Sequence, residues 1–243
     1  MKRSLNLLAL LGIALGAQAC AAGNLADLAI YDRTEGKRLP VYWHGGRAYV
    51  AGKPGNEYQV KVRNRAGEDL LAVVSVDGVN AITGQTADAS QSGYVLSPGS
   101  AVDVQGWRKS LSQTAAFYFT SLPDSYAART GRPDNVGVIG VALFRRKPEP
   151  LAQIAPVENE KRSANRDAAA APRAEAQIGT GHGRLETAYA RYVSFERASA
   201  TPAEIVTVYY DSRANLVARG IIRDAGPLAP LPRPFPGFAP DPA

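Results

Sequence analysis

The stretch "EYQVKVRN", residues 57–64, decides the fold class, because apolar and polar residues alternate along it. In an extended chain Tyr58, Val60 and Val62 fall on one side, and the polar residues between them fall on the other. A period of two is typical of an antiparallel strand with one face in a core and the other in water. The stretch therefore predicts a sheet that is buried on one face.

Two longer apolar runs predict the centre of the fold. "LLAVVSV" (residues 70–76) and "VGVIGVALF" (residues 136–144) contain almost no polar residue. A strand with one face in water needs polar residues on that face, and these runs have almost none. We therefore expect them in the centre of two packed layers. Further strands are expected at residues 48–51, 93–96, 102–107 and 115–120, which are rich in β-branched and aromatic residues.

Helical periodicity is nearly absent from this part of the chain. The exception is "PDSYAARTG", residues 123–131, which begins with Pro and ends with Gly, as a helical turn or a short helix does. Asp77 and Gly78 favour a hairpin turn over a calcium loop, because the alternating acidic positions of such a loop are missing. Many short strands over about 120 residues predict an all-β fold at residues 24–146, an antiparallel β-sandwich of immunoglobulin-like or jelly-roll-like type.

The composition changes after the sandwich. Residues 147–177 lack aromatic residues and are rich in Pro, Ala and charge, which predicts a disordered linker. Residues 178–223 regain strand patterning but are too few for an independent domain, so we expect this C-terminal β segment to dock on the sandwich. Residues 224–243 are Pro-rich, which favours either a mobile polyproline II tail or a ligand for an aromatic groove. The strands expected in the C-terminal β segment are residues 189–195, 204–210 and 216–222.

The N-terminus indicates export. Lys2 and Arg3 precede an apolar run and then small residues, which is the order of a secretory signal peptide at residues 1–19. Cleavage would give a periplasmic or extracellular protein. Cys20 offers the alternative of a lipid-anchored lipoprotein, although the residues before it fit ordinary cleavage better. The apolar run is shorter than the roughly 20 residues of a membrane span, so no transmembrane span is expected.

The charge of the chain indicates which partners it attracts. The formal net charge is +6. Basic patches attract anions, which for an exported protein are lipid head groups, lipopolysaccharide and cell-wall polymers. The predicted partner is therefore an envelope component or another protein, and the simpler interpretation is a solvated surface. No nucleic-acid-binding signature occurs, which argues against a nucleic-acid partner. The basic clusters lie at residues 33–38, 61–65, 106–110 and 144–147.

Three stretches carry a resemblance to known sequences. "VVSVDG" (residues 73–78), "DSYAARTGRPDNVGVIGVALF" (residues 124–144) and "GTGHGRLE" (residues 179–186) resemble uncharacterised exported bacterial proteins. The resemblance covers most of residues 24–222. It brings no known activity, cofactor or catalytic residue to this chain.

One candidate ligand site lies in "GWRKS". Trp107, Arg108 and Lys109 place an aromatic ring beside two cations after an expected strand, which suits a carbohydrate or an anion. The alternative is that Trp107 belongs to the core or its rim. His182 is a further candidate, because "IGTGHGR" (residues 178–184) sets it among three glycines.

The glycines around His182 predict a hinge. Gly179, Gly181 and Gly183 recur at every second position, which does not fit a phosphate-binding glycine loop. Glycine turns through positive φ or passes close to another backbone, as a chain that leaves a linker and joins a sheet must do. His182 is then expected to be a turn or rim residue.

Catalytic motifs are absent from the sequence, which favours a binding protein over an enzyme and predicts no cofactor. A single cysteine excludes internal disulfides and thiolate zinc clusters. The alternative is a periplasmic hydrolase or metalloenzyme that uses His182 and His44, assembled from distant residues. Its other members would be Ser125 or Ser92 as nucleophile and Asp124 or Asp77 as orienting acid.

Overall fold

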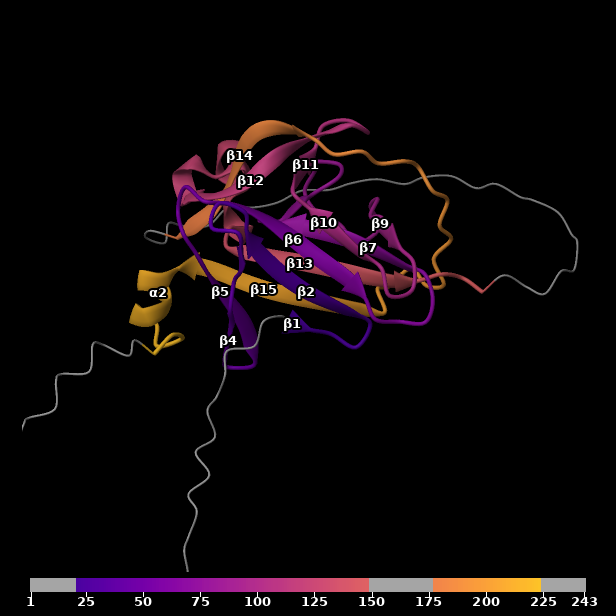
Figure 1. Cartoon of the computed structure of the whole chain (residues 1–243), viewed down its shortest axis with the longest axis horizontal. Helices are drawn as coiled ribbons and strands as arrows, with labels where there is room; N and C mark the ends of the chain where they lie inside the picture. Colours follow the sequence, from indigo (N-terminus) through magenta and orange to yellow (C-terminus); the bar gives the residue numbers. More distant parts are fainter. Residues whose placement is uncertain (1–20, 149–176, 224–243) are drawn as a thin grey trace, which may run out of the picture.

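Two facing β-sheets form the protein, as a computed structural model of the chain shows (Figure 1). The structure describes residues 21–148 and 177–223. The predictions of a signal peptide, of a lipid anchor at Cys20, of most of the linker and of the Pro-rich tail lie outside these residues. Within the described part, the prediction of an all-β sandwich is confirmed, and no helix there is long and apolar enough to cross a membrane.

Sheet 1 has eight strands, with β1-β2-β6-β12-β11 as its main path. Of the other three strands, β3 pairs with β2, β10 pairs with β6, and β14 pairs with β12. The strands of sheet 1 are β1 (Ala21–Ala22), β2 (Ala26–Asp32), β3 (Lys37–Arg38), β6 (Glu57–Asn64), β10 (Ala101–Val104), β11 (Gly106–Arg108), β12 (Gln113–Ser121) and β14 (Ile178–Thr187).

Sheet 2 has seven strands in the order β4-β5-β15-β13-β7-β8, with β9 paired to β7. β15 runs parallel to β5, whereas it runs antiparallel to β13 on its other side. The strands of sheet 2 are β4 (Val41–His44), β5 (Arg47–Gly52), β7 (Leu70–Val76), β8 (Val79–Asn80), β9 (Tyr94–Leu96), β13 (Val138–Arg145) and β15 (Glu204–Ser212).

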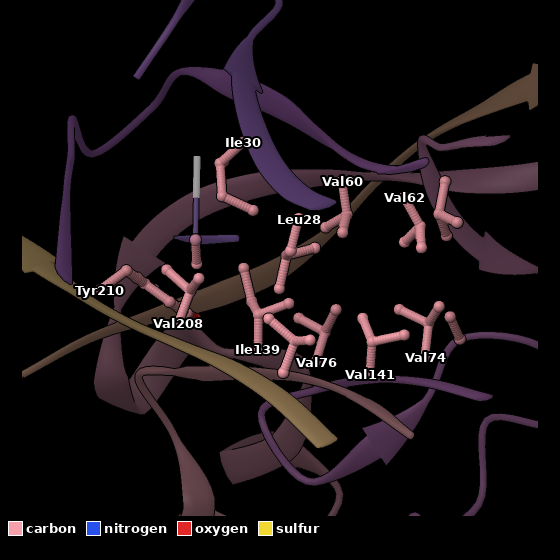
Figure 2. Close-up of a cluster of buried hydrophobic side chains, with 14 of the residues drawn as sticks. Leu28, Ile30, Val60, Val62, Val74, Val76, Ile139, Val141, Val208 and Tyr210 are labelled. Atoms are coloured by element: carbon pink, nitrogen blue, oxygen red, sulfur yellow. The ribbon is translucent and has the colours of Figure 1, made fainter. Parts of the chain in front are cut away.

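The core lies between the two sheets. β6 alternates as its sequence predicts, because Tyr58, Val60 and Val62 are fully buried while the residues between them are partly exposed. Side chains from sheet 1 meet side chains from sheet 2 across this interface (Figure 2). In Figure 2 the labelled residues from sheet 1 are Leu28, Ile30, Val60 and Val62, and those from sheet 2 are Val74, Val76, Ile139, Val141, Val208 and Tyr210.

β7 is buried on both faces, as its continuous apolar run predicts. Its inner face joins the main core, and its outer face forms a second cluster with Phe144 of β13. The segment before β15 covers this cluster, because Phe195 packs on it and the Arg197 guanidinium lies 4.2 Å from the Phe144 ring centre. The sequence of β7 is apolar throughout because both of its faces are covered by other side chains.

Two local predictions are confirmed. Asp77 and Gly78 form the turn between β7 and β8, and both have positive φ, 53° and 71°, as a two-residue hairpin turn requires. The expected helical segment contains η1 (Leu122–Asp124) and α1 (Tyr126–Arg129), and it is followed by η2 (Pro133–Asn135).

The C-terminal β segment joins both sheets. β14 extends sheet 1 beside β12, and β15 lies between β5 and β13 inside sheet 2. The expected docking is therefore confirmed, and β15 is an inner strand of its sheet.

Two of the expected C-terminal strands are wrong. Residues 189–195 form no strand, because backbone pairing with the β11–β12 turn ends at Ala190, and Tyr192 is 89% exposed. Residues 216–222 contain the end of α2 (Arg213–Ala218) and a turn. The Ser212 side chain caps this helix, and its apolar residues pack on the outer face of sheet 2 rather than alternating between two faces.

Candidate functional site

The glycines of "IGTGHGR" lie inside β14, so the prediction of a hinge there is wrong. None of the three adopts positive φ. They are needed for close packing, because a Cβ atom on Gly181 would lie 2.1 Å from the Tyr118 ring and one on Gly179 would lie 2.6 Å from Ser125. Glycine at every second position therefore gives β14 one face without side chains, against which Tyr118 of β12 and the segment before α1 pack.

His182 projects from the opposite face of β14. The register places it across from Phe117 of β12. Its ring is nearly parallel to that of Trp107, with 6.3 Å between ring centres and 8° between planes. The ring of Tyr126, from α1, lies 5.4 Å away. β11, β14 and α1 thus bring together three aromatic rings that are far apart in the sequence.

Trp107 supports this group from within the core. It is 2% exposed, and its ring meets that of Phe117 edge-on at 4.7 Å. It also lies 4.7 Å from Tyr126. Trp107 therefore belongs to the core, which is the alternative to a ligand site, and it packs against His182 and Tyr126 from below the surface.

Arg108 has a structural contact as well. One of its guanidinium nitrogens donates to the carbonyl of Ala188 at 2.8 Å and to that of Ser110 at 3.1 Å. These bonds tie the β11–β12 turn to the chain that leaves β14. Of the four predicted ligand residues, Lys109 is exposed and His182 is partly exposed, so these two remain available to a ligand.

The surroundings of His182 are positively charged. Burial lowers the pKa of His182, and the nearby charges of Lys109 and Arg129 lower it further, which keeps the ring neutral at neutral pH. The Arg132 guanidinium lies 5.8 Å from the Tyr126 ring centre. We call the group formed by His182, Tyr126, Lys109, Arg129 and Arg132 the basic surface. Within the described residues, none of its three cations forms an ion pair.

The residues of the catalytic alternative are not brought together. His44 lies at the end of β4 in sheet 2, whereas His182 belongs to sheet 1. The Ser125 hydroxyl donates to the Leu122 carbonyl at 2.7 Å and accepts from the Ala128 N–H, so it serves as a helix cap. Residues 21–148 and 177–223 contain no group of three His, Cys, Asp or Glu side chains that could hold a metal ion.

In the part of the chain that the structure describes, the hydrogen bonds of Asp124 and Ser92 do not include either histidine. Asp124 accepts a hydrogen bond from the Ser121 hydroxyl at 2.7 Å. The carbonyl of Ser92 accepts from the Asn80 amide, and its side chain is exposed. Neither residue has a contact that would orient an imidazole.

Asp77 is a buried residue whose role the sequence did not reveal. Its carboxylate accepts hydrogen bonds from the Tyr210 hydroxyl at 2.6 Å, the Thr180 N–H at 2.7 Å and the Gly137 N–H at 2.9 Å. Burial raises the pKa of Asp77, and these donors oppose part of that rise. Asp77 belongs to the β7–β8 turn of sheet 2, and it accepts a hydrogen bond from the backbone N–H of Thr180 at the edge of β14 in sheet 1.

A chain of hydroxyl groups continues from Asp77 into the core. The Thr180 hydroxyl lies 2.7 Å from that of Tyr210 and 2.5 Å from that of Tyr58. Because the Tyr210 proton goes to Asp77, Thr180 donates to Tyr210 and accepts from Tyr58. This buried network joins β6, β14, β15 and the β7–β8 turn, and it is enclosed by the core, so its role is structural.

The basic surface is the part of the molecule best suited to a ligand. Its partly exposed rings can pack against an apolar or carbohydrate face, and its cations can pair with anionic groups. His182 adds a charge that depends on pH. No protein-family model, curated protein or solved structure matches this chain.

Proposed function

We propose that this protein is an exported, non-enzymatic β-sandwich that binds an anionic carbohydrate of the cell envelope at the basic surface. Export is supported by the signal-peptide pattern of residues 1–19, which favours the periplasm or the medium over a lipid anchor at Cys20. The ligand class is supported by aromatic rings beside uncompensated cations. Such rings contact sugar faces, and such cations contact phosphate or carboxylate groups.

The observation that carries this proposal is a contrast along β14. Only two residues beyond His182, Arg184 pairs with Glu57 at 2.8 Å, and Glu57 also lies 3.6 Å from Arg33. Around His182, by comparison, Lys109 and Arg129 are exposed without a carboxylate partner in the described chain. Unpaired cations of this kind give a local positive potential that attracts anions.

The contacts of His182 favour binding over hydrolysis. A catalytic imidazole needs a nucleophile on one side and an orienting group on the other. The described neighbours of His182 are the rings of Trp107 and Tyr126 and the charges of Lys109 and Arg129. The two rings hold the imidazole of His182 in place, and the two cations lower its pKa. A fixed ring beside two cations suits recognition of an anion.

The test compares a phosphorylated envelope oligosaccharide with the same oligosaccharide after removal of its phosphates. We expect saturable binding of the phosphorylated form that weakens with salt, and weaker binding of the other form. The double variant Lys109→Ala, Arg129→Ala should lose about tenfold or more in affinity, since a hydrogen bond to a charged group contributes about 1.5 kcal/mol or more. Arg63→Ala is the matched control, because Arg63 is also exposed and lies at the end of β6.

The binding should also depend on pH. Protonation of His182 adds a positive charge, so affinity for the phosphorylated form should rise as the pH falls through the lowered pKa, below 6.5. His182→Gln should remove this rise. Equal affinity of the Lys109 and Arg129 double variant and the wild type, or equal binding of both oligosaccharides, would contradict the proposal.

A further inference from the structure

A second candidate site lies on the outer face of sheet 2. A depression of about 280 Å³ opens where β5 begins and β15 ends, next to η2. This volume is close to the lower end of small-molecule sites, which span roughly 300–1,000 Å³. Tyr49, Tyr209, Arg47 and Arg219 line it, and none of them belongs to the basic surface.

These four residues form a row in which two guanidinium groups flank two rings. The Tyr49 and Tyr209 ring centres are 5.5 Å apart. The Arg47 guanidinium lies 5.6 Å from the Tyr209 ring centre, and the Arg219 guanidinium lies 5.6 Å from that of Tyr49. A guanidinium that lies over a ring keeps N–H groups at its edge for an anion, and its planar fork fits two oxygens of a phosphate.

The fold fixes one side of this row. Asp211 is 5% exposed and lies 3.7 Å from Arg219, and it also accepts the Ser212 N–H at 2.7 Å. Tyr49 is buried against the apolar side of α2, where it packs with Leu216. Arg219 is therefore anchored before a ligand arrives, which lowers the entropy cost of binding.

Arg47 lies at the other end of the row, and its side chain is available to a ligand. It is exposed beside the β4–β5 turn, and within the described residues it forms no ion pair. Its contact with Tyr209 leaves its charge uncompensated. Two cations thus line one small depression, and of these two only Arg219 is within ion-pair distance of a carboxylate in the described residues.

The depression also contains polar side chains that could hydrogen-bond to a ligand. Asp134, Asn135 and Gln177 also line it, and all three are exposed. Carboxylate and amide groups hydrogen-bond to hydroxyl groups, and the Asp134 carboxylate disfavours a second anionic group on the same ligand. We infer that the depression binds a small sugar phosphate, with the phosphate at Arg47 and Arg219 and the sugar hydroxyls toward Asp134, Asn135 and Gln177.

Calorimetric titration of the full chain with glucose 1-phosphate, inorganic phosphate and glucose tests this inference. We expect saturable binding of glucose 1-phosphate, weaker binding of phosphate and no binding of glucose. Arg47→Ala should weaken glucose 1-phosphate binding by about tenfold or more, because it removes one charged fork. Arg47→Lys should fall between Arg47→Ala and the wild type, since it keeps the charge and loses the fork. Arg63→Ala again removes one exposed cation elsewhere and should change nothing.

Asp134→Ala separates the sugar from the phosphate. It should weaken the binding of glucose 1-phosphate and leave inorganic phosphate unaffected or bound more tightly. The double variant Lys109→Ala, Arg129→Ala should bind glucose 1-phosphate as the wild type does, so failure here and failure of the proposed function are distinguishable. Absence of saturation below about 10 mM, or equal affinities of Arg47→Ala and wild type, would overturn the inference.

Discussion

Thr180→Val tests the buried hydroxyl network most directly. Valine has nearly the shape of threonine and suits a strand, so β14 should keep its backbone and its N–H bond to Asp77. The substitution removes only the hydroxyl that lies between Tyr58 and Tyr210. Tyr210 keeps its bond to Asp77, whereas the hydroxyl of Tyr58 loses the Thr180 oxygen to which it donates.

The expected cost follows from the burial of Tyr58. This residue is fully buried, and a buried hydroxyl left without a partner costs about 1–3 kcal/mol. A loss of about 2 kcal/mol lowers the melting temperature of a chain of this size by about 4–8 °C. We therefore expect Thr180→Val to unfold at a clearly lower urea concentration, with an unchanged dependence of the unfolding free energy on urea.

A second substitution should restore part of this loss. In the double variant Tyr58→Phe, Thr180→Val both partners become apolar with their shapes kept, which is nearly neutral for a buried pair. The double variant should therefore be more stable than Thr180→Val alone. Tryptophan fluorescence reports urea unfolding of all four proteins of the cycle, because Trp107 is buried 4.7 Å from Phe117 whereas Trp43 is already exposed. Stability losses that simply add, or a Thr180→Val protein as stable as the wild type, would refute this reasoning.

Two further predictions concern packing and pH. Gly181→Ala should destabilise the fold by about 1–3 kcal/mol, because its Cβ would meet the Tyr118 ring, whereas Gly140→Ala in β13 meets nothing within 4 Å and should be tolerated; equal melting temperatures would contradict this. Burial raises the folded-state pKa of Asp77 above 3.8, so its contribution to stability should be greatest below that pH and fall as the pH rises through the raised pKa. The unfolding free energy of wild type minus that of Asp77→Asn should therefore decrease from about pH 4 upward, and an increase would show that the sign is wrong.

Local patterns in the sequence predicted those parts of the fold that depend on neighbouring residues. The alternation in residues 57–64 identified the buried face of β6, because side chains in a strand alternate between faces. Asp77 and Gly78 identified the β7–β8 turn, because that turn needs positive φ at both positions. The strand predicted at residues 216–222 is wrong, since a helix of six residues is too short to show a helical period.

The candidate sites depend on partners far away in the sequence. Asp77 meets Thr180 and Tyr210 across 103 and 133 residues, so its burial could not be predicted from "VDG". His182 was singled out because it lies among glycines, but the reason for these glycines is Tyr118, which belongs to another strand. Composition identifies the residue types that a site uses, and only the pairing of strands shows which of them meet.

The place of β15 has a consequence for the order in which the chain acquires its structure. β15 is the last in sequence of the strands in residues 21–148 and 177–223, and it separates β5 from β13. Until it arrives, both of these strands keep an unpaired edge, and such edges readily pair with other chains. Contacts between residues so distant in sequence also slow folding. Within the described residues, sheet 2 of a nascent chain is therefore divided into two parts, each with an unpaired edge, until β15 has been synthesised.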